Sequence, residues 1–175
     1  WCGFVFPAGI NFPKEIGFQV DARDCLFDSF VLNTVLFKES VDFSISVFRN
    51  RFFVKSSVFE SNATFDNCRF EGSVEFISTH FKAASFYRAD FSGRTILRAN
   101  FSTRGTFNEA IFRDGVVFSG WRNINLKVSD TLHIQVSGMT AHLTTGNTKS
   151  TLKQRVKQRF TQFRGSIYQS AEQLQ

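Results

Sequence analysis

The side chains best suited to acid–base chemistry, nucleophilic attack or metal binding are scattered along this chain. The three histidines, His80, His133 and His142, are isolated. A catalytic or metal-binding histidine needs partner groups at a defined spacing, such as a nucleophile, an orienting carboxylate or a second ligand. The sequence also contains no glycine-rich phosphate loop and no nucleophile elbow. We therefore expect no catalytic activity, no cofactor and no bound metal.

The cysteines do not indicate a site either. Cys2, Cys25 and Cys68 are too few and too widely separated for a structural zinc site. We interpret Cys25 and Cys68 as buried free thiols, which indicates a reducing compartment and a cytoplasmic location. No transmembrane helix is predicted, because no stretch approaches about eighteen uninterrupted apolar residues. The chain begins at Trp1 without methionine, so we expect a fragment or a processed chain.

Positive charge is concentrated at the C-terminal end. Residues 27–120 carry eleven bases and ten acids, whereas residues 121–175 carry eight bases and two acids. From Leu152 to Leu174, apolar residues recur at steps of three and four, the period of an amphipathic helix. We therefore predict a basic amphipathic α-helix over residues 148–175. Its candidate contacts with an anionic surface are Lys149, Lys153, Arg155, Lys157, Arg159 and Arg164.

The part of the chain before this helix has a different period. From Phe27 to Phe118, a large apolar residue, usually phenylalanine, recurs every five or six residues. A small residue usually lies two positions before it. Such a step fits neither a helix nor a strand, so it indicates a repeat architecture. The small residue is missing from three pairs: Phe30 and Leu32, Arg51 and Phe53, and Arg94 and Ile96.

This repeat resembles that of the pentapeptide-repeat family, whose units read roughly A-[DN]-[LF]-x-x. Residues 89–93 (Ala-Asp-Phe-Ser-Gly) and 99–103 (Ala-Asn-Phe-Ser-Thr) match the unit, and the resemblance covers about residues 27–120. It implies a right-handed quadrilateral β-helix with four units per coil. The expected fold is thus an all-β solenoid of about four to five coils with a C-terminal amphipathic α-helix.

With four units per coil, every fourth member of the series should stack on one of four faces. Members of each such ladder are 20–23 residues apart, so every coil can close. The predicted inward ladders are Phe27, Phe48, Phe70, Phe91 and Phe112 on the first face; Leu32, Phe53, Phe76, Ile96 and Phe118 on the second; Phe37, Phe59, Phe81 and Phe101 on the third; and Phe43, Phe65, Phe86 and Phe107 on the fourth.

Four segments follow from these patterns. We predict an N-terminal cap over residues 1–26 and a β-helix over residues 27–120. Residues 121–147 are predicted to form a strand-rich C-terminal cap or connector, because apolar residues alternate there. Residues 148–175 are predicted to form the basic helix.

One outward feature of the predicted solenoid indicates an interaction site. In this register, apolar residues next to the second-face ladder point outward as a continuous stripe, which should not be left in water. Three interpretations remain open: the C-terminal helix covers the stripe, a second copy or another protein covers it, or the register of this face is wrong by one residue. The stripe comprises Val31, Phe52, Val54, Ile77, Leu97 and Val117.

The leading functional hypothesis is a non-enzymatic protein-interaction scaffold, with an unknown protein partner or a second copy of the chain. The alternative is peripheral attachment to a membrane or another anionic surface through the basic helix. A third hypothesis is the gyrase-binding DNA mimicry of the quinolone-resistance branch of the family. We expect it less, because the rod is nearly neutral, the tail is basic and the central residue is Phe. No specific nucleic acid is expected as a partner.

Overall fold

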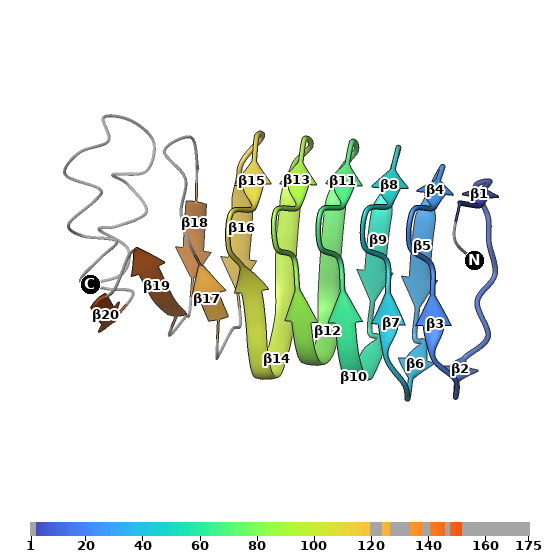
Figure 1. Cartoon of the computed structure of the whole chain (residues 1–175), viewed down its shortest axis with the longest axis horizontal. Coiled ribbons are helices and arrows are strands. Elements are labelled where there is room, and N and C mark those ends of the chain that lie inside the picture. Colours follow the sequence, from blue (N-terminus) through green and yellow to red (C-terminus); the bar gives the residue numbers. More distant parts are fainter. Residues whose placement is uncertain (1–2, 120–123, 127–133, 138–140, 146–147, 152–175) are drawn as a thin grey trace.

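The computed structural model describes residues 3–119, 124–126, 134–137, 141–145 and 148–151. The described strands stack into an all-β solenoid of about five turns, which confirms the solenoid part of the predicted fold. The coils follow one another along the long axis of the molecule, beginning with β1 at the N-terminal end (Figure 1). The described residues contain no helix.

Four parallel ladders of strands run along the solenoid. The first ladder consists of β1 (Val5–Phe6), β4 (Leu26–Phe27), β8 (Val47–Phe48), β11 (Arg69–Phe70), β13 (Asp90–Phe91) and β15 (Ile111–Phe112). The second contains β5 (Phe30–Asn33), β9 (Phe52–Lys55), the first residues of β12 (Val74–Ser85) and β14 (Thr95–Phe107), then β16 (Val116–Ser119) and β18 (Ile134–Ser137).

The third and fourth ladders share their long strands. The third contains β2 (Glu15–Ile16), β6 (Leu36–Phe37), the start of β10 (Val58–Thr64) and the middle of β12 and β14. The fourth contains β3 (Val20–Asp21), β7 (Val41–Asp42), the ends of β10, β12 and β14, then β17 (Ile124–Leu126) and β19 (Ala141–Thr145). Since the ladders follow one another around each coil, the second and fourth lie on opposite sides.

Stacked phenylalanine rings fill three sides of the core, as predicted. On the first face, centroids from Phe27 to Phe112 are 4.5–5.0 Å apart and nearly parallel. The third and fourth faces repeat this arrangement, with separations of 4.6–5.3 Å. Burying such side chains contributes about 2 kcal/mol each, and offset ring stacks add to this.

On the second face, the predicted register was wrong by one residue at Phe53 and Ile96. Phe52, Val54 and Leu97 are buried, whereas Phe53 and Ile96 point outward and are half-buried. The strand pairing places Val54 beside Leu32 and Phe76, and Leu97 beside Phe76. From the second coil onward, three residues separate the first-face phenylalanine from the first inward residue of this face. The central residue is therefore six positions after that phenylalanine, and the predicted step of five was wrong for Phe53 and Ile96.

The corners of the coil have their own backbone requirements. Between the fourth and first faces, Asp24, Ile45, Asn67, Arg88 and Glu109 all have positive φ. Between the first and second faces, successive corners stack closely: a Cβ on Gly72 would lie 1.8 Å from the carbonyl oxygen of Asn50. A side chain at this position would therefore force the coils apart.

Hydroxyl and thiol groups occupy several of the small inward positions. Ser57 accepts a hydrogen bond from the Val35 N–H at 3.1 Å and donates one to the Lys55 carbonyl at 3.0 Å. Cys25 and Cys68 are buried free thiols, as predicted. Cys68 Sγ donates to the Phe43 carbonyl at 3.0 Å, and burial raises the pKa of its thiol. These groups are satisfied inside the core by backbone atoms.

The C-terminal helix was wrongly predicted at its start. β20 (Thr148–Thr151) is a strand that pairs antiparallel with β19, Thr145 lying opposite Thr148. Gly and Asn occupy positions 146 and 147, a pair typical of two-residue hairpin loops that sequence reasoning missed. The rest of the predicted helix, residues 152–175, lies outside the described residues.

Candidate interaction surface

The outer side of the second ladder carries a row of mostly apolar side chains. Register pairing aligns five residues, one from each coil: Val31, Phe53, Glu75, Ile96 and Val117. Val31 is 45% exposed, and the other four are half-buried. Apart from Glu75, the row presents only hydrocarbon to the outside. We call it the second-face row.

The structure places only three of the six residues of the predicted stripe on the outside. Val31, Ile77 and Val117 do point outward, and Ile77 lies two residues after Glu75 on the same side of β12. Phe52, Val54 and Leu97 belong to the core and cannot contact a partner. Phe53 and Ile96 replace them. The reason is the alternation of side chains along a strand: a shift of one residue exchanges the two sides.

Arg51 connects two members of the row. Its guanidinium carbon lies 4.1 Å from the centroid of the Phe53 ring, and its Nη2 lies 3.4 Å from Oε1 of Glu75 in the next coil. The ring and the carboxylate both contact the guanidinium and restrict the motion of this long side chain. A stacked arginine loses less side-chain entropy when a partner binds, and arginine is common among the residues that dominate interfaces.

Basic residues flank the row on both sides. The residues just before the second-face strands form one column, because backbone hydrogen bonds connect each of these positions to the next coil. This column contains Arg51 and, two coils later, Arg94. On the side after the strands, pairing aligns Lys55 and Arg98 in a column with Ile77 between them. The second-face row and the two columns beside it contain four bases and one acid, Glu75. This surface therefore has a net charge of +3. Lys55, Arg94 and Arg98 are exposed.

The fourth face, on the opposite side, has a different surface. From the first coil to Thr106, its central outward column carries carboxylates and hydroxyls: Asp21, Asp42, Thr64, Ser85 and Thr106. Several of these groups bond to residues at the neighbouring corner: Asp42 accepts from Ser44, and Ser85 donates to Asp66. Asp66 Oδ1 also accepts a hydrogen bond from the Tyr87 N–H at 2.9 Å, and Arg23 forms an ion pair with Asp21 at 2.8 Å. Arg23 also holds the pKa of Asp21 at about 2.

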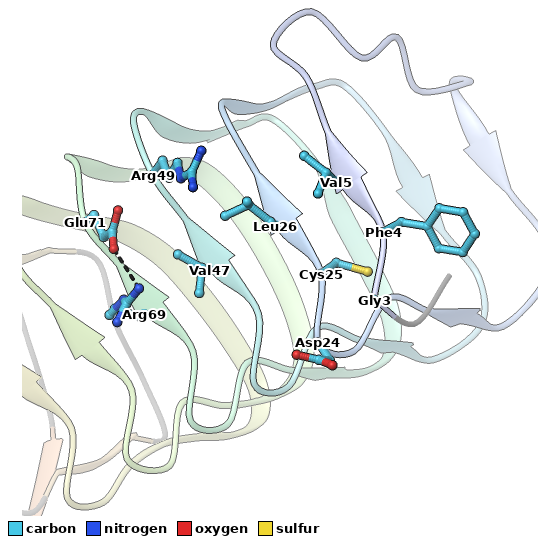
Figure 2. Close-up of a pocket in the computed structure, with 10 residues that line it drawn as sticks. All are labelled: Gly3, Phe4, Val5, Asp24, Cys25, Leu26, Val47, Arg49, Arg69 and Glu71. Atoms are coloured by element: carbon cyan, nitrogen blue, oxygen red, sulfur yellow. Dashed lines mark ion pairs between the residues drawn. The ribbon is translucent and has the colours of Figure 1, made fainter.

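A shallow pocket lies on the first face near the N-terminal end (Figure 2). Its volume is about 410 Å³, and Val5, Leu26 and Val47 form successive steps of its floor. Arg69 and Glu71 lie at one side and form an ion pair at 2.9 Å. The thiol of Cys25 belongs to the buried core. The polar groups of this pocket do not converge on a common point, so it lacks the geometry of a catalytic centre.

The other candidate reactive groups are also separate. Among the described residues, no three His, Cys, Asp or Glu side chains are grouped closely enough to hold a metal ion. His80 is exposed, and its Nε2 lies 2.8 Å from the Ser102 hydroxyl. Within the part of the chain that the structure describes, no helix is long and apolar enough to cross a bilayer.

Most of the predicted basic contacts near the C-terminus fall outside the described residues. Lys149 is part of β20, and Lys153, Arg155, Lys157, Arg159 and Arg164 lie outside the described residues. Their role as contacts to an anionic surface stays a prediction.

Comparison with known families agrees with this geometry. A family model described as pentapeptide repeats, with nine copies, matches residues 55–99. Residues 55–99 therefore carry pentapeptide repeats, and the solenoid of the described residues is consistent with them. The matched residues include Phe59, Phe65, Phe70, Phe81 and Phe86, which are central residues of three of the four ladders. Neither the curated proteins nor the solved structures contain a significant match. The repeats account for the solenoid, whereas the fold alone assigns no function to the second-face row.

Proposed function

We propose that this protein is a non-enzymatic interaction scaffold and that its second-face row, with the flanking bases, is the contact surface. The observation that carries the proposal is the outward apolar row Val31, Phe53, Ile96 and Val117 on one side of a regular solenoid. An apolar centre with a charged rim is the usual composition of a protein interface. Isolated apolar residues are ordinary on a surface, but four of them in register across five coils are not.

The solenoid is well suited to this role because its faces are preorganised. Hydrogen bonds run from each coil to the next, and inward rings stack along three ladders. Cross-coil ion pairs such as Arg113 with Asp90 and Arg88 with Glu109 add contacts on the outside. A surface that is already ordered loses little conformational entropy on binding, so more of the contact energy contributes to affinity.

A catalytic role or DNA mimicry is supported less well. The pocket of Figure 2 is shallow and has no convergent polar groups. A DNA mimic must present a negative field like that of phosphates. The second face instead has a net charge of +3.

Attachment to an anionic surface is a second candidate function, and it rests on the sequence of residues 149–164. This segment has six bases and no acid. Co-sedimentation with vesicles containing phosphatidylserine would test it. We expect the full chain to bind at low salt and a chain ending at residue 151 to lose most of that binding. Equal binding by both chains would contradict this function. A cytoplasmic location stays part of the same proposal.

Site-specific photo-crosslinking in cells tests the scaffold proposal. A photoreactive amino acid at position 31 or 96 probes the second face, and one at position 64 or 85 probes the fourth face as a matched control. We expect discrete protein adducts from positions 31 and 96 that disappear when Phe53→Ser is added. The same adducts from all four positions would show that no face is preferred and would contradict the proposal.

A further inference from the structure

We infer that the second-face row binds an acidic amphipathic α-helix of a partner protein, aligned with the solenoid axis. This inference rests on the proposed function and specifies the partner that such a surface fits. It follows from the axial spacing of the row, the positions of the flanking bases and the charge of the alternatives.

The spacing of the row is close to that of an α-helix. Adjacent coils are about 4.8 Å apart, because their strands pair as in any sheet. A helix presents one apolar position per turn on a given side, and its turns are about 5.4 Å apart. The four steps from Val31 to Val117 span about 19 Å, which corresponds to about thirteen residues of helix. An extended peptide, with like-facing side chains about 6.6 Å apart, would match this repeat less well.

The flanking bases have the spacing that acidic residues on such a helix would need. Arg51 and Arg94 are two coils apart on one side of the row, and Lys55 and Arg98 are two coils apart on the other. Two coils span about 9.6 Å, and two turns of helix span about 10.8 Å. Glu or Asp residues beside the apolar stripe, seven positions apart, would therefore face one base on each side of every second coil.

Glu75 does not interrupt this surface as a bare charge would. Its carboxylate is held by Arg51 in the neighbouring coil. In the same coil, Ile77 points outward two residues later and continues the apolar surface toward the Lys55 side. We therefore expect the partner helix to have a small or polar residue opposite Glu75 and its larger apolar residues on either side.

Charge disfavours the two occupants that the chain itself could supply. A symmetric dimer through this surface would bring two faces of net charge +3 together, which costs association free energy. Residues 152–175 carry five bases and one acid, so this segment is also repelled by the face. An acidic helix gains from the same charges, which makes it the occupant that the surface favours.

Fluorescence anisotropy with a synthetic peptide tests the inference. The probe is a labelled helical peptide of about eighteen residues, with leucines at steps of three and four, glutamates on both flanks and alanines behind. Its controls are a scrambled peptide of the same composition and a version with lysine in place of glutamate. We expect the acidic peptide to bind the full chain at low salt at least about tenfold more tightly than either control.

Two matched double variants locate the binding site. Lys55→Glu with Arg98→Glu reverses one base from the second coil and one from the fourth, and should weaken binding by about tenfold or more. Arg49→Glu with Lys82→Glu makes the same change of net charge on the first and third faces, and should change it less than about threefold. All of these residues are exposed, so both variants should fold, which their melting curves would verify.

The outcomes separate the inference from the function on which it rests. Equal binding of the acidic and scrambled peptides, or equal weakening by both double variants, would overturn the inference. If the adducts at positions 31 and 96 form but the acidic peptide does not compete for them, the scaffold proposal survives and the acidic-helix inference fails. Loss of both the adducts and the peptide binding would contradict the two together.

Discussion

The first and second ladders share one backbone geometry but fill the core in different ways. On the first face, the second inward position of every coil from Phe27 to Phe112 is phenylalanine, and each ring stacks on the next. On the second face, the ring changes position. Phe52 stacks on Phe30 at 4.9 Å from the first inward position, whereas the ring of Phe76 comes from the second position and is tilted by 51° to Phe52.

This difference shows that the second face does not keep its large side chain at one inward position. Phe52 is followed by Val54 at the second inward position, and Val74 is followed by Phe76. The second and third coils thus each place one ring and one valine inside, in opposite order, whereas the first coil has Phe30 with Leu32 and the fourth has Thr95 with Leu97. An outward Phe53 between two inward apolar residues makes both sides of the strand apolar. The second face is therefore the side on which inside and outside are hardest to distinguish.

The largest effect is expected from a charge placed inside the second face. Leu97→Asp puts a carboxylate at a position that is 1% exposed and should cost at least about 4 kcal/mol or prevent folding. Ile96→Asp, one residue earlier, places the same group outside and should cost less than about 1 kcal/mol. Urea denaturation of both variants measures the difference. Equal destabilisation would show that this face has no defined inside.

Breaking a continuous ring ladder should have the next largest effect. Phe86 is fully buried and stacks on Phe65 and Phe107 at 4.8 and 4.6 Å. Phe86→Ala should cost about 3–5 kcal/mol, because it removes a buried ring and leaves a cavity between two others. Ile77→Ala on the outside of the second face is the control and should cost less than about 1 kcal/mol. An unchanged melting temperature for Phe86→Ala would contradict the ladder.

The smallest effect at neutral pH is expected from the buried thiol of Cys68. Burial raises its pKa above the ordinary value of 9.0, so the thiol stays neutral in the folded protein and ionises more easily in the unfolded chain. Its contribution to stability is therefore complete below pH 9.0 and declines as the pH rises above that value. Denaturation of wild type and Cys68→Ala between neutral and alkaline pH measures this. A difference between the two proteins that does not change with pH would contradict it.

Much of the fold could be predicted from the sequence, because a five-residue step with one large and one small apolar residue fits few structures. Three of the four ladders have the predicted inward residues. The error on the second face had a signal: the supposed small inward residues before Phe53 and Ile96 were Arg51 and Arg94. An arginine cannot occupy a small core position, and moving the register by one residue replaces it with Phe52 and Thr95.

The candidate surface could be predicted less well for the same physical reason. The sequence pattern indicated the second face, but a slip of one residue exchanges its inner and outer sides. The flanking bases became visible only once hydrogen bonds aligned Arg51 with Arg94 and pairing aligned Lys55 with Arg98. β20 was missed because Thr148–Thr151 was interpreted as the capped start of a helix. The threonines at both ends of this segment favour a strand.

One matched pair of variants tests the register of the second face most directly. Phe52 and Phe53 are adjacent and chemically identical, and the structure places the first fully inside and the second on the outer surface. Measured by urea denaturation, Phe52→Ala should lower the free energy of unfolding by about 3–5 kcal/mol and Phe53→Ala by about 1 kcal/mol or less. Only Phe53→Ala should also weaken partner adducts at positions 31 and 96 in a protein that remains folded. A larger loss of stability from Phe53→Ala than from Phe52→Ala would contradict the assignment of the surface.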